Sequence, residues 1–193
     1  MIPAINESGV LPPFLPAYGP ADPAAMSPYT ASMTEIATRF AITAERKAIL
    51  MGLLGYRQAL RDAGITDGFQ WVDGSYLEEC ERDRGHAPND IDIVTFAERP
   101  NAAVDDASWA VFFAQNKTTL FDPNAIKKAY RCDAYYQDLD LPAKIIVSRV
   151  RYWFGLFSHR RLTYLWKGLL QIPLQDDDQA ALDLLSGGAH NAP

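Results

Sequence analysis

Residues 69–96 constrain the fold more than any other part of the chain. They begin with aromatic and β-branched residues that are typical of a short buried strand, and Gly74 then permits a turn that a Cβ would hinder. Good helix formers occupy residues 76–84, and a segment containing Gly and Pro interrupts them. Residues 90–96 alternate polar and apolar side chains at their start. The sequence therefore predicts strand, tight turn, helix and second strand in that order.

Asp90 and Asp92 fall on one face of the second strand, because side chains alternate across a strand. Two carboxylates roughly 6 to 7 Å apart repel each other, and Ile91 and Ile93, which alternate with them, indicate a buried strand. A divalent cation, Mg²⁺ or Mn²⁺, prefers oxygen ligands and would relieve the repulsion while leaving room for phosphate oxygens. The alternative is an ordinary βαβ unit with an exposed aspartate pair at the start of a strand.

Gly74 and Ser75 are candidates for phosphate binding. Ser75 can open the helix that we expect after the turn, and backbone N–H groups at a helix N-terminus attract anions. The turn and the aspartate pair thus favour the same ligand, a nucleoside triphosphate with its metal ion.

This order of motifs resembles the DNA polymerase β-like nucleotidyltransferase superfamily. Its members carry a Gly-Ser turn, a helix and an Asp-hydrophobic-Asp strand, which correspond here to Gly74-Ser75 and Asp90-Ile91-Asp92. The gap between the two motifs is longer than in many members. The resemblance implies a third carboxylate from a later strand, with all three acting as catalytic, metal-binding residues. It also implies that the Gly-Ser turn holds the β- and γ-phosphates.

Asp133 is the candidate for the third carboxylate. Residues 130–139 have the pattern of a strand, and alternation places Asp133, Tyr135 and Gln137 on one face. Asp133 is the only acidic residue inside this segment, because Asp138 falls at its end. The alternative is a lone aspartate on an edge strand.

A second resemblance, to small bacterial nucleotidyltransferase-like proteins of poorly known activity, covers most of the chain. It rests on residues 9–13, on the Pro-Asn-Asp-Ile-Asp block at 88–92, and on a closing pattern of Trp153, Phe157, Arg160 and Lys167-Gly168. Residues 141–175 contain no Asp or Glu, although the chain has a net charge of −6. Lys167 and Arg160 are therefore candidates for triphosphate or acceptor-phosphate contacts. Surface basicity that aids solubility is the alternative for both.

The composition is that of an ordinary globular protein. The 193 residues suit one domain, with 48% hydrophobic and 22% charged residues. No apolar run is long enough to cross a membrane, and the N-terminus has no secretory pattern. Two cysteines are too few for a disulfide framework, so we expect a cytoplasmic protein.

We predict an α/β (α+β) fold, with a small mixed sheet flanked by helices. Residues 1–42 are a Pro-rich arm packed on the domain, 43–175 form the nucleotidyltransferase-like domain, and 176–193 form an acidic, partly disordered tail. For the arm, contact with substrate or a second copy is the alternative to an extended segment over the surface, which we favour. Further helices are expected at residues 33–40, 43–64, 109–116 and 142–158, another starting at Asp122-Pro123, and a last strand at residues 162–174.

By resemblance, the expected activity is metal-dependent transfer of a nucleoside monophosphate from a nucleoside triphosphate to an acceptor hydroxyl. The acceptor would be a protein, an RNA end or a small molecule, and a bacterial toxin–antitoxin or antiphage system with a partner protein is one setting. The alternative is a catalytically silent nucleotide-binding or antitoxin-like partner module on the same fold.

Overall fold

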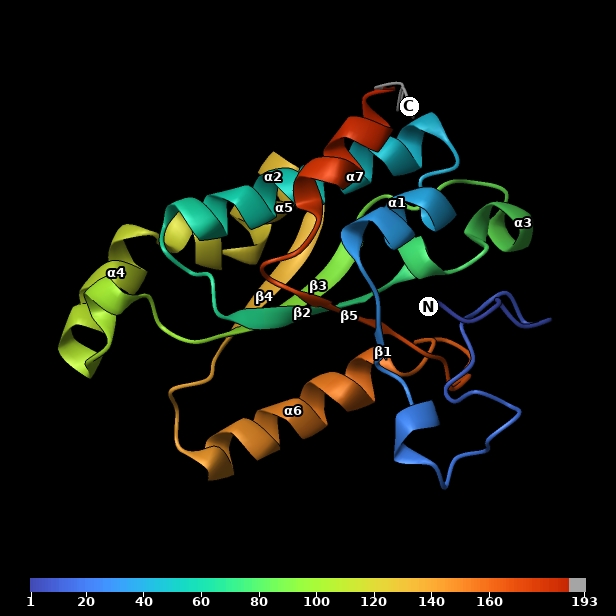
Figure 1. The fold of residues 1–193 in the computed structure, drawn as a ribbon, viewed down its shortest axis with the longest axis horizontal. Helices are drawn as coiled ribbons and strands as arrows, with labels where there is room; N and C mark the ends of the chain where they lie inside the picture. Colours follow the sequence, from blue (N-terminus) through green and yellow to red (C-terminus); the bar gives the residue numbers. More distant parts are fainter. Residues whose placement is uncertain (188–193) are drawn as a thin grey trace, which may run out of the picture.

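The computed structural model describes residues 1–187 and confirms the predicted fold class: a mixed sheet of five strands has helices on both faces (Figure 1). The strands are β1 (Tyr29–Thr30), β2 (Gly68–Asp73), β3 (Ile91–Ala97), β4 (Cys132–Asp138) and β5 (Leu170–Pro173). The α-helices are α1 (Met33–Phe40), α2 (Ala44–Asp62), α3 (Cys80–Arg84), α4 (Asp106–Gln115), α5 (Pro123–Tyr130), α6 (Ala143–Phe157) and α7 (Asp178–Leu185). Short 3-10 helices lie at Pro23–Ala25, Ser75–Leu77 and Asn101–Ala103, and one π-helical turn at Lys117–Phe121.

The strand order is β1-β5-β2-β3-β4. β3 pairs antiparallel with β2 and parallel with β4, while β5 pairs antiparallel with β2 and parallel with β1. The end of β2 and the starts of β3 and β4 therefore meet at one end of the sheet.

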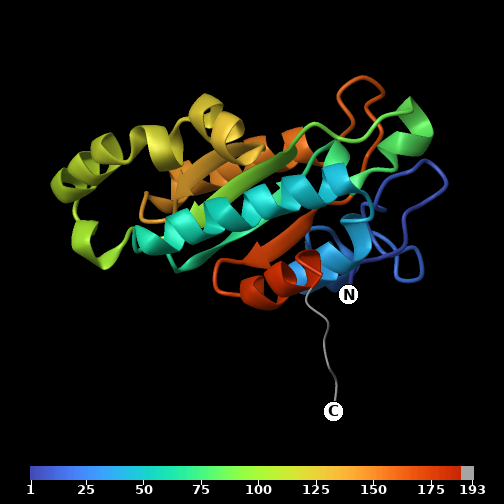
Figure 2. The same ribbon diagram turned by 90° about the horizontal axis from the view of Figure 1, so that it is seen from above.

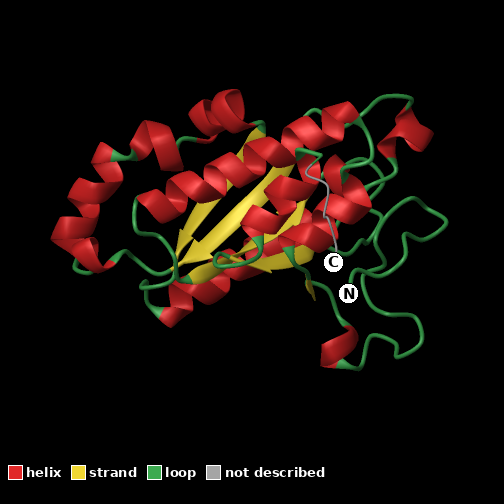
Figure 3. Cartoon of the chain, turned by 45° about the horizontal axis from the view of Figure 1, so that its top comes forward, coloured by secondary structure: helices red, strands yellow, loops and turns green. Residues whose placement is uncertain are grey.

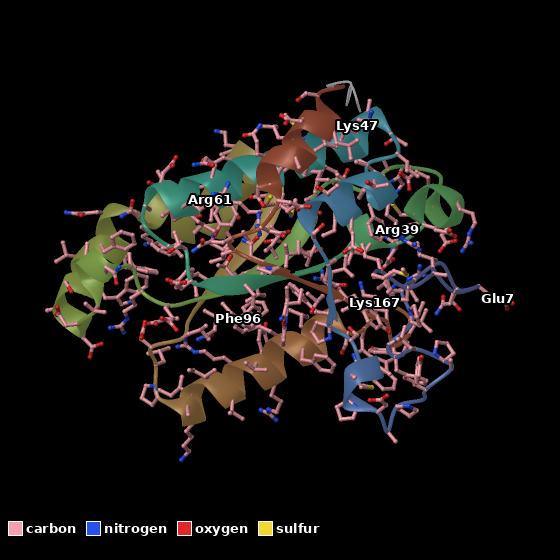
Figure 4. All side chains as sticks on the ribbon, viewed as in Figure 1. Glu7, Arg39, Lys47, Arg61, Phe96 and Lys167 are labelled. Carbon is pink, nitrogen blue, oxygen red and sulfur yellow. The ribbon has the colours of Figure 1, made fainter. Side chains whose placement is uncertain are left out.

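Strict alternation gives the sheet two different faces. Val72, Ile93 and Ala134 belong to the main core, which also contains buried residues of α1, α2, α5 and α7. Figures 1 and 2 show α2 running across this face, and Figure 3 shows the strands as a single layer beneath these helices. Trp71 and Phe96 point the other way, into a smaller aromatic cluster with residues of α6. Figure 4 places Phe96 between the sheet and α6.

The N-terminal segment is joined to the sheet. Backbone N–H groups of Tyr29 and Ala31 donate to carbonyls of Leu169 and Gln171, and the Tyr29 hydroxyl donates to the Pro12 carbonyl oxygen at 2.8 Å. Leu11 is buried in the main core. Residues of the predicted arm thus supply an edge strand, through β1, and a core helix, through α1.

The continuous helix predicted for residues 76–84 is wrong. A single 3-10 turn, Ser75–Leu77, is followed by an extended Glu78, and α3 begins only at Cys80. The buried guanidinium of Arg46 donates to the carbonyl oxygens of Tyr76 and Glu78, both at 2.7 Å. Because a long-range partner takes up these carbonyls, the segment need not form a continuous helix.

Two further differences lie near the C-terminal end of the chain. The predicted strand at 162–174 is reduced to β5, because residues 161–163 form a turn that is closed by a bridge between His159 and Trp166. Helix α7 was not predicted; it is attached through Asp178, whose carboxylate accepts from Arg57 and Arg61. The disorder predicted for the last part of the tail, residues 188–193, falls outside the described residues. Among residues 1–187, no helix is both long and apolar enough to span a membrane.

Candidate functional site

The register of three strands places Asp73, Asp92 and Asp133 in one row. Asp73 of β2 is the partner of Asp92 of β3, and Asp92 is the partner of Asp133 of β4. Register partners on neighbouring strands share a face of the sheet, here the face covered by α6. Asp90 directly precedes β3, two residues before Asp92. The structure therefore brings the three predicted carboxylates to the same end of the sheet and adds Asp73 to them.

The backbone of Gly74 lies directly against the side chain of Asp92. Its φ of 86° lies in the left-handed region, and a Cβ at this position would overlap Oδ2 of Asp92. The glycine thus allows the Asp92 carboxylate to lie directly against the turn. Ser75 follows as the first residue of a three-residue 3-10 helix, whose N-cap, Gly74, has no capping side chain. The helix that begins at this turn is therefore only one turn long, so the dipole of a long helix does not contribute here.

Lys127 of α5 pairs with two of the predicted ligands. Its ammonium forms ion pairs with Asp90 and, at 3.5 Å, with Oδ2 of Asp133. The hydrogen bond to Asp90 raises the pKa of Lys127. Sequence reasoning missed this lysine, because its position six residues before Asp133 carries no strand or motif signal.

Lys167 lies at the opposite side of the row, in contact with Asp73. Its Nζ donates a hydrogen bond to Oε1 of Glu78 at 2.9 Å. Nζ also lies 2.9 Å from Oδ1 of Asp73, where the two groups form an ion pair without hydrogen-bond geometry. Only 4% of the residue is exposed. Burial alone would lower the pKa of Lys167, but the two carboxylates outweigh it and the pKa is raised. Its ammonium is thus engaged with carboxylates and buried. Figure 4 labels Lys167 at this end of the sheet.

Arg160, the other basic candidate, is also part of an ion-pair network. Its guanidinium donates to Oε2 of Glu78 and to Asp83, both at 3.0 Å, and Arg84 donates to the same Glu78 oxygen. Glu78 is buried, so three cationic side chains surround one enclosed carboxylate. Arg160 is therefore held by Glu78 and Asp83 in this structure, and its contact with phosphate stays a prediction.

Comparison with protein-family models gave one result for the chain. A model described as a family of unknown function, DUF6932, matches residues 3–173. The chain belongs to this family. The matched range contains the whole aspartate row, the Gly74 turn and both lysines, and it ends with β5. No curated protein and no solved structure matched this DUF6932 chain.

Asp92 is the carboxylate of the DUF6932 site that lacks a counter-ion. Among residues 1–187, no side chain forms an ion pair or hydrogen bond with it, whereas lysines pair with its neighbours Asp73, Asp90 and Asp133. Burial, followed by repulsion from these three carboxylates, raises the pKa of Asp92 to about 7. The repulsion from three neighbouring carboxylates would favour a cation beside Asp92, whereas its burial favours a proton.

The donor set of the DUF6932 site fits a hard divalent cation, because every candidate ligand is a carboxylate oxygen and Asp92 is unpaired. The side chains are not arranged as a ready cage, however: within the described residues, no three Asp, Glu, His or Cys side chains gather closely enough to hold a metal ion. Asp90 and Asp133 contact Lys127 instead. The metal site at Asp90, Asp92 and Asp133 thus stays a prediction that requires a side-chain rearrangement.

Two hollows on the surface of the DUF6932 chain lie away from the aspartates. One is lined by Met1, Ile2 and residues of α1, and the other lies between α2 and α7. Neither includes a carboxylate of the row, so the aspartate end of the sheet is the candidate site on chemical grounds and not because of a deep pocket.

Proposed function

We propose that this DUF6932 chain is a metal-dependent nucleotidyltransferase, which transfers a nucleoside monophosphate from a nucleoside triphosphate to an acceptor hydroxyl. The observation that carries the proposal is the unpaired carboxylate of Asp92, which lies against Gly74 in the middle of a row of aspartates. The polymerase β-like superfamily, which the motifs resemble, uses this kind of arrangement. The DUF6932 assignment names no superfamily, so that likeness is part of the proposal.

Asp90, Asp92 and Asp133 would hold Mg²⁺ or Mn²⁺. When bound, the metal would supply charge neutralisation for the triphosphate and a lowered pKa for the acceptor hydroxyl. Backbone N–H groups at Gly74 and Ser75 would donate to the β- and γ-phosphates. Asp133 would accept a hydrogen bond from the acceptor hydroxyl and take up its proton. The acceptor oxygen then bonds to the α-phosphorus, the bond to the β-phosphate oxygen breaks, and pyrophosphate leaves.

Lys167 has a different role in this proposal from the phosphate contact expected from the sequence. Its buried ammonium bridges Asp73 and Glu78, which lie on either side of the Gly74 turn. This bridge would fix the position of the turn relative to β2. Lys167 is therefore a positioning residue, which acts on the nucleotide only through the Gly74 turn.

The acceptor would be a protein, an RNA end or a small molecule, and a partner protein would complete its binding site. A cytoplasmic setting suits the proposal, because nucleoside triphosphates are abundant there and the thiols of Cys80 and Cys132 are free. A bacterial toxin–antitoxin or antiphage system is the setting suggested by the resemblance.

A second candidate is a catalytically silent nucleotide-binding or antitoxin-like partner module. It is favoured by one observation: Lys127 and Lys167 form ion pairs with Asp90, Asp133, Asp73 and Glu78, so these carboxylates have cationic partners within the chain. A scaffold would need only such internal pairs.

The test is incubation of the protein with each α-labelled nucleoside triphosphate, Mn²⁺ and a cell extract, followed by measurement of label transfer and pyrophosphate. We expect transfer with the wild type and none with Asp92→Asn. The matched control, Asp67→Asn, changes an exposed carboxylate and should retain activity. Nucleotide binding without transfer in the wild type would favour the silent module.

A further inference from the structure

Lys127 is the outermost member of the charged cluster at the end of the sheet. Its side chain is 47% exposed, compared with 18% for Asp90 and 27% for Asp133, the two carboxylates that it contacts. It comes from the last turn of α5, and the chain enters β4 directly after Arg131, whose φ is 57°. The ammonium thus approaches the aspartates from the solvent side, on a long side chain.

The two contacts of Lys127 engage two of the three proposed metal ligands. Asp90 precedes β3 and Asp133 belongs to β4, so the ammonium links two separate strands. Asp92, two residues after Asp90 and the register partner of Asp133, has no direct contact with this lysine. Two of the three proposed metal ligands are therefore occupied by an internal cation, and the third is left open.

We propose that Lys127 is an exchangeable counter-ion, which holds Asp90 and Asp133 in the metal-free protein and gives way when a divalent cation binds. This inference rests on the metal site of the proposed function. Two cations cannot share the same pair of carboxylates without strong repulsion, so binding of the metal requires the ammonium to leave. The exposed side chain can move without unpacking the core, because the buried residue of α5 is Ile126 and not Lys127.

Release of the ammonium would couple the metal to the nucleotide. A displaced Lys127 stays within reach of the same end of the sheet, where the triphosphate would bring its negative charge. Ammonium groups bind phosphate as mobile point charges. The same lysine would thus lower the affinity for metal alone and raise the affinity for metal that arrives with a triphosphate.

The experiment compares Mn²⁺ binding to the wild type, Lys127→Met and Lys128→Met, measured by the electron paramagnetic resonance signal of free Mn²⁺. Lys128 is the matched control, since it is an exposed neighbouring lysine of α5 and forms no ion pair within the described part of the chain. We expect Lys127→Met to bind Mn²⁺ at least about tenfold more tightly than the wild type, and Lys128→Met to stay within about twofold. Adding Asp90→Asn to Lys127→Met should abolish the gain.

Melting curves provide a second readout that does not depend on activity. In EDTA, Lys127→Met should melt below the wild type, because Asp90 and Asp133 lose their counter-ion. In Mn²⁺ the order should reverse. Equal Mn²⁺ affinity in the wild type and Lys127→Met, or an equal gain in Lys128→Met, would overturn the inference.

The label-transfer assay separates this inference from the proposed function. Tighter Mn²⁺ binding by Lys127→Met without transfer by the wild type would support the exchangeable counter-ion and reject the nucleotidyltransferase. Transfer by the wild type together with unchanged Mn²⁺ affinity in Lys127→Met would reject the exchange and keep the enzyme.

Discussion

Replacing Asp92 with asparagine should change how the stability of the metal-free protein depends on pH. The pKa of Asp92 is raised to about 7 by burial and by Asp73, Asp90 and Asp133. A carboxyl group with a raised pKa binds its proton more tightly in the folded state than in the unfolded state. Its contribution to stability is therefore complete below the unfolded pKa, near 3.9, and is lost as the pH rises through about 7.

The size of the effect follows from the shift. A rise of roughly three pKa units corresponds to about 4 kcal/mol over the whole titration, of which about 2 to 3 kcal/mol falls between pH 5 and pH 8. Asparagine has nearly the shape of the protonated carboxyl group and does not ionise. Asp92→Asn should therefore match the wild type only below about pH 4, and its advantage in free energy of unfolding should grow by about 2 to 3 kcal/mol between pH 5 and pH 8.

The assay is urea denaturation in EDTA at several pH values from 5 to 8, for the wild type, Asp92→Asn and the exposed control Asp67→Asn. The difference between the wild type and each variant removes the contributions that they share. Asp67→Asn should run parallel to the wild type. A difference between the wild type and Asp92→Asn that does not change with pH would refute the idea of a strained carboxylate at this position.

Three further outcomes are expected. Millimolar Mn²⁺ should raise the melting temperature of the wild type and leave that of Asp92→Asn unchanged, because the ion binds only the folded site; a response in both would place the ion elsewhere. Ser75→Ala should weaken triphosphate binding in a calorimetric titration and lower the free energy of unfolding by no more than about 1 kcal/mol. Gly74→Val should lower both the triphosphate affinity and the stability, because Gly74 has a φ of 86° and contacts Asp92. Lys167→Met should destabilise the protein by about 3 to 5 kcal/mol in urea denaturation, because it leaves the buried Asp73 without its cation and removes one of the three cations around Glu78. A loss below about 1 kcal/mol would contradict this bridge.

The local parts of the fold could be predicted from the sequence, because periodicity reports them directly. The alternation around Asp92 and around Asp133 gave both the strands and the faces on which these carboxylates lie. The N-cap of α2 at Thr43 and the proline at the start of α5 were also visible as local signals.

The remaining features depend on contacts between distant segments. Asp73 joins the row only through the register of β2 with β3, which no pattern within β2 specifies. The break at Glu78 depends on Arg46, more than thirty residues earlier in the chain. Gly168, next to Lys167, packs tightly against the carbonyl of Pro12, so the N-terminal segment lies close to this lysine. The basic segment by itself predicts a phosphate contact and carries no signal for the contacts of Lys167 with Asp73 and Glu78.

The most direct test of the proposed site is a crystal structure with Mn²⁺ and a non-hydrolysable nucleoside triphosphate, in which the anomalous signal locates the metal. We expect a peak about 2.1 Å from carboxylate oxygens of Asp90, Asp92 and Asp133. We also expect the triphosphate to lie at the Gly74 turn and Lys127 to have moved away from Asp90. A Mn²⁺ peak elsewhere, or none, with Lys127 still on Asp90 and Asp133, would contradict the central claim.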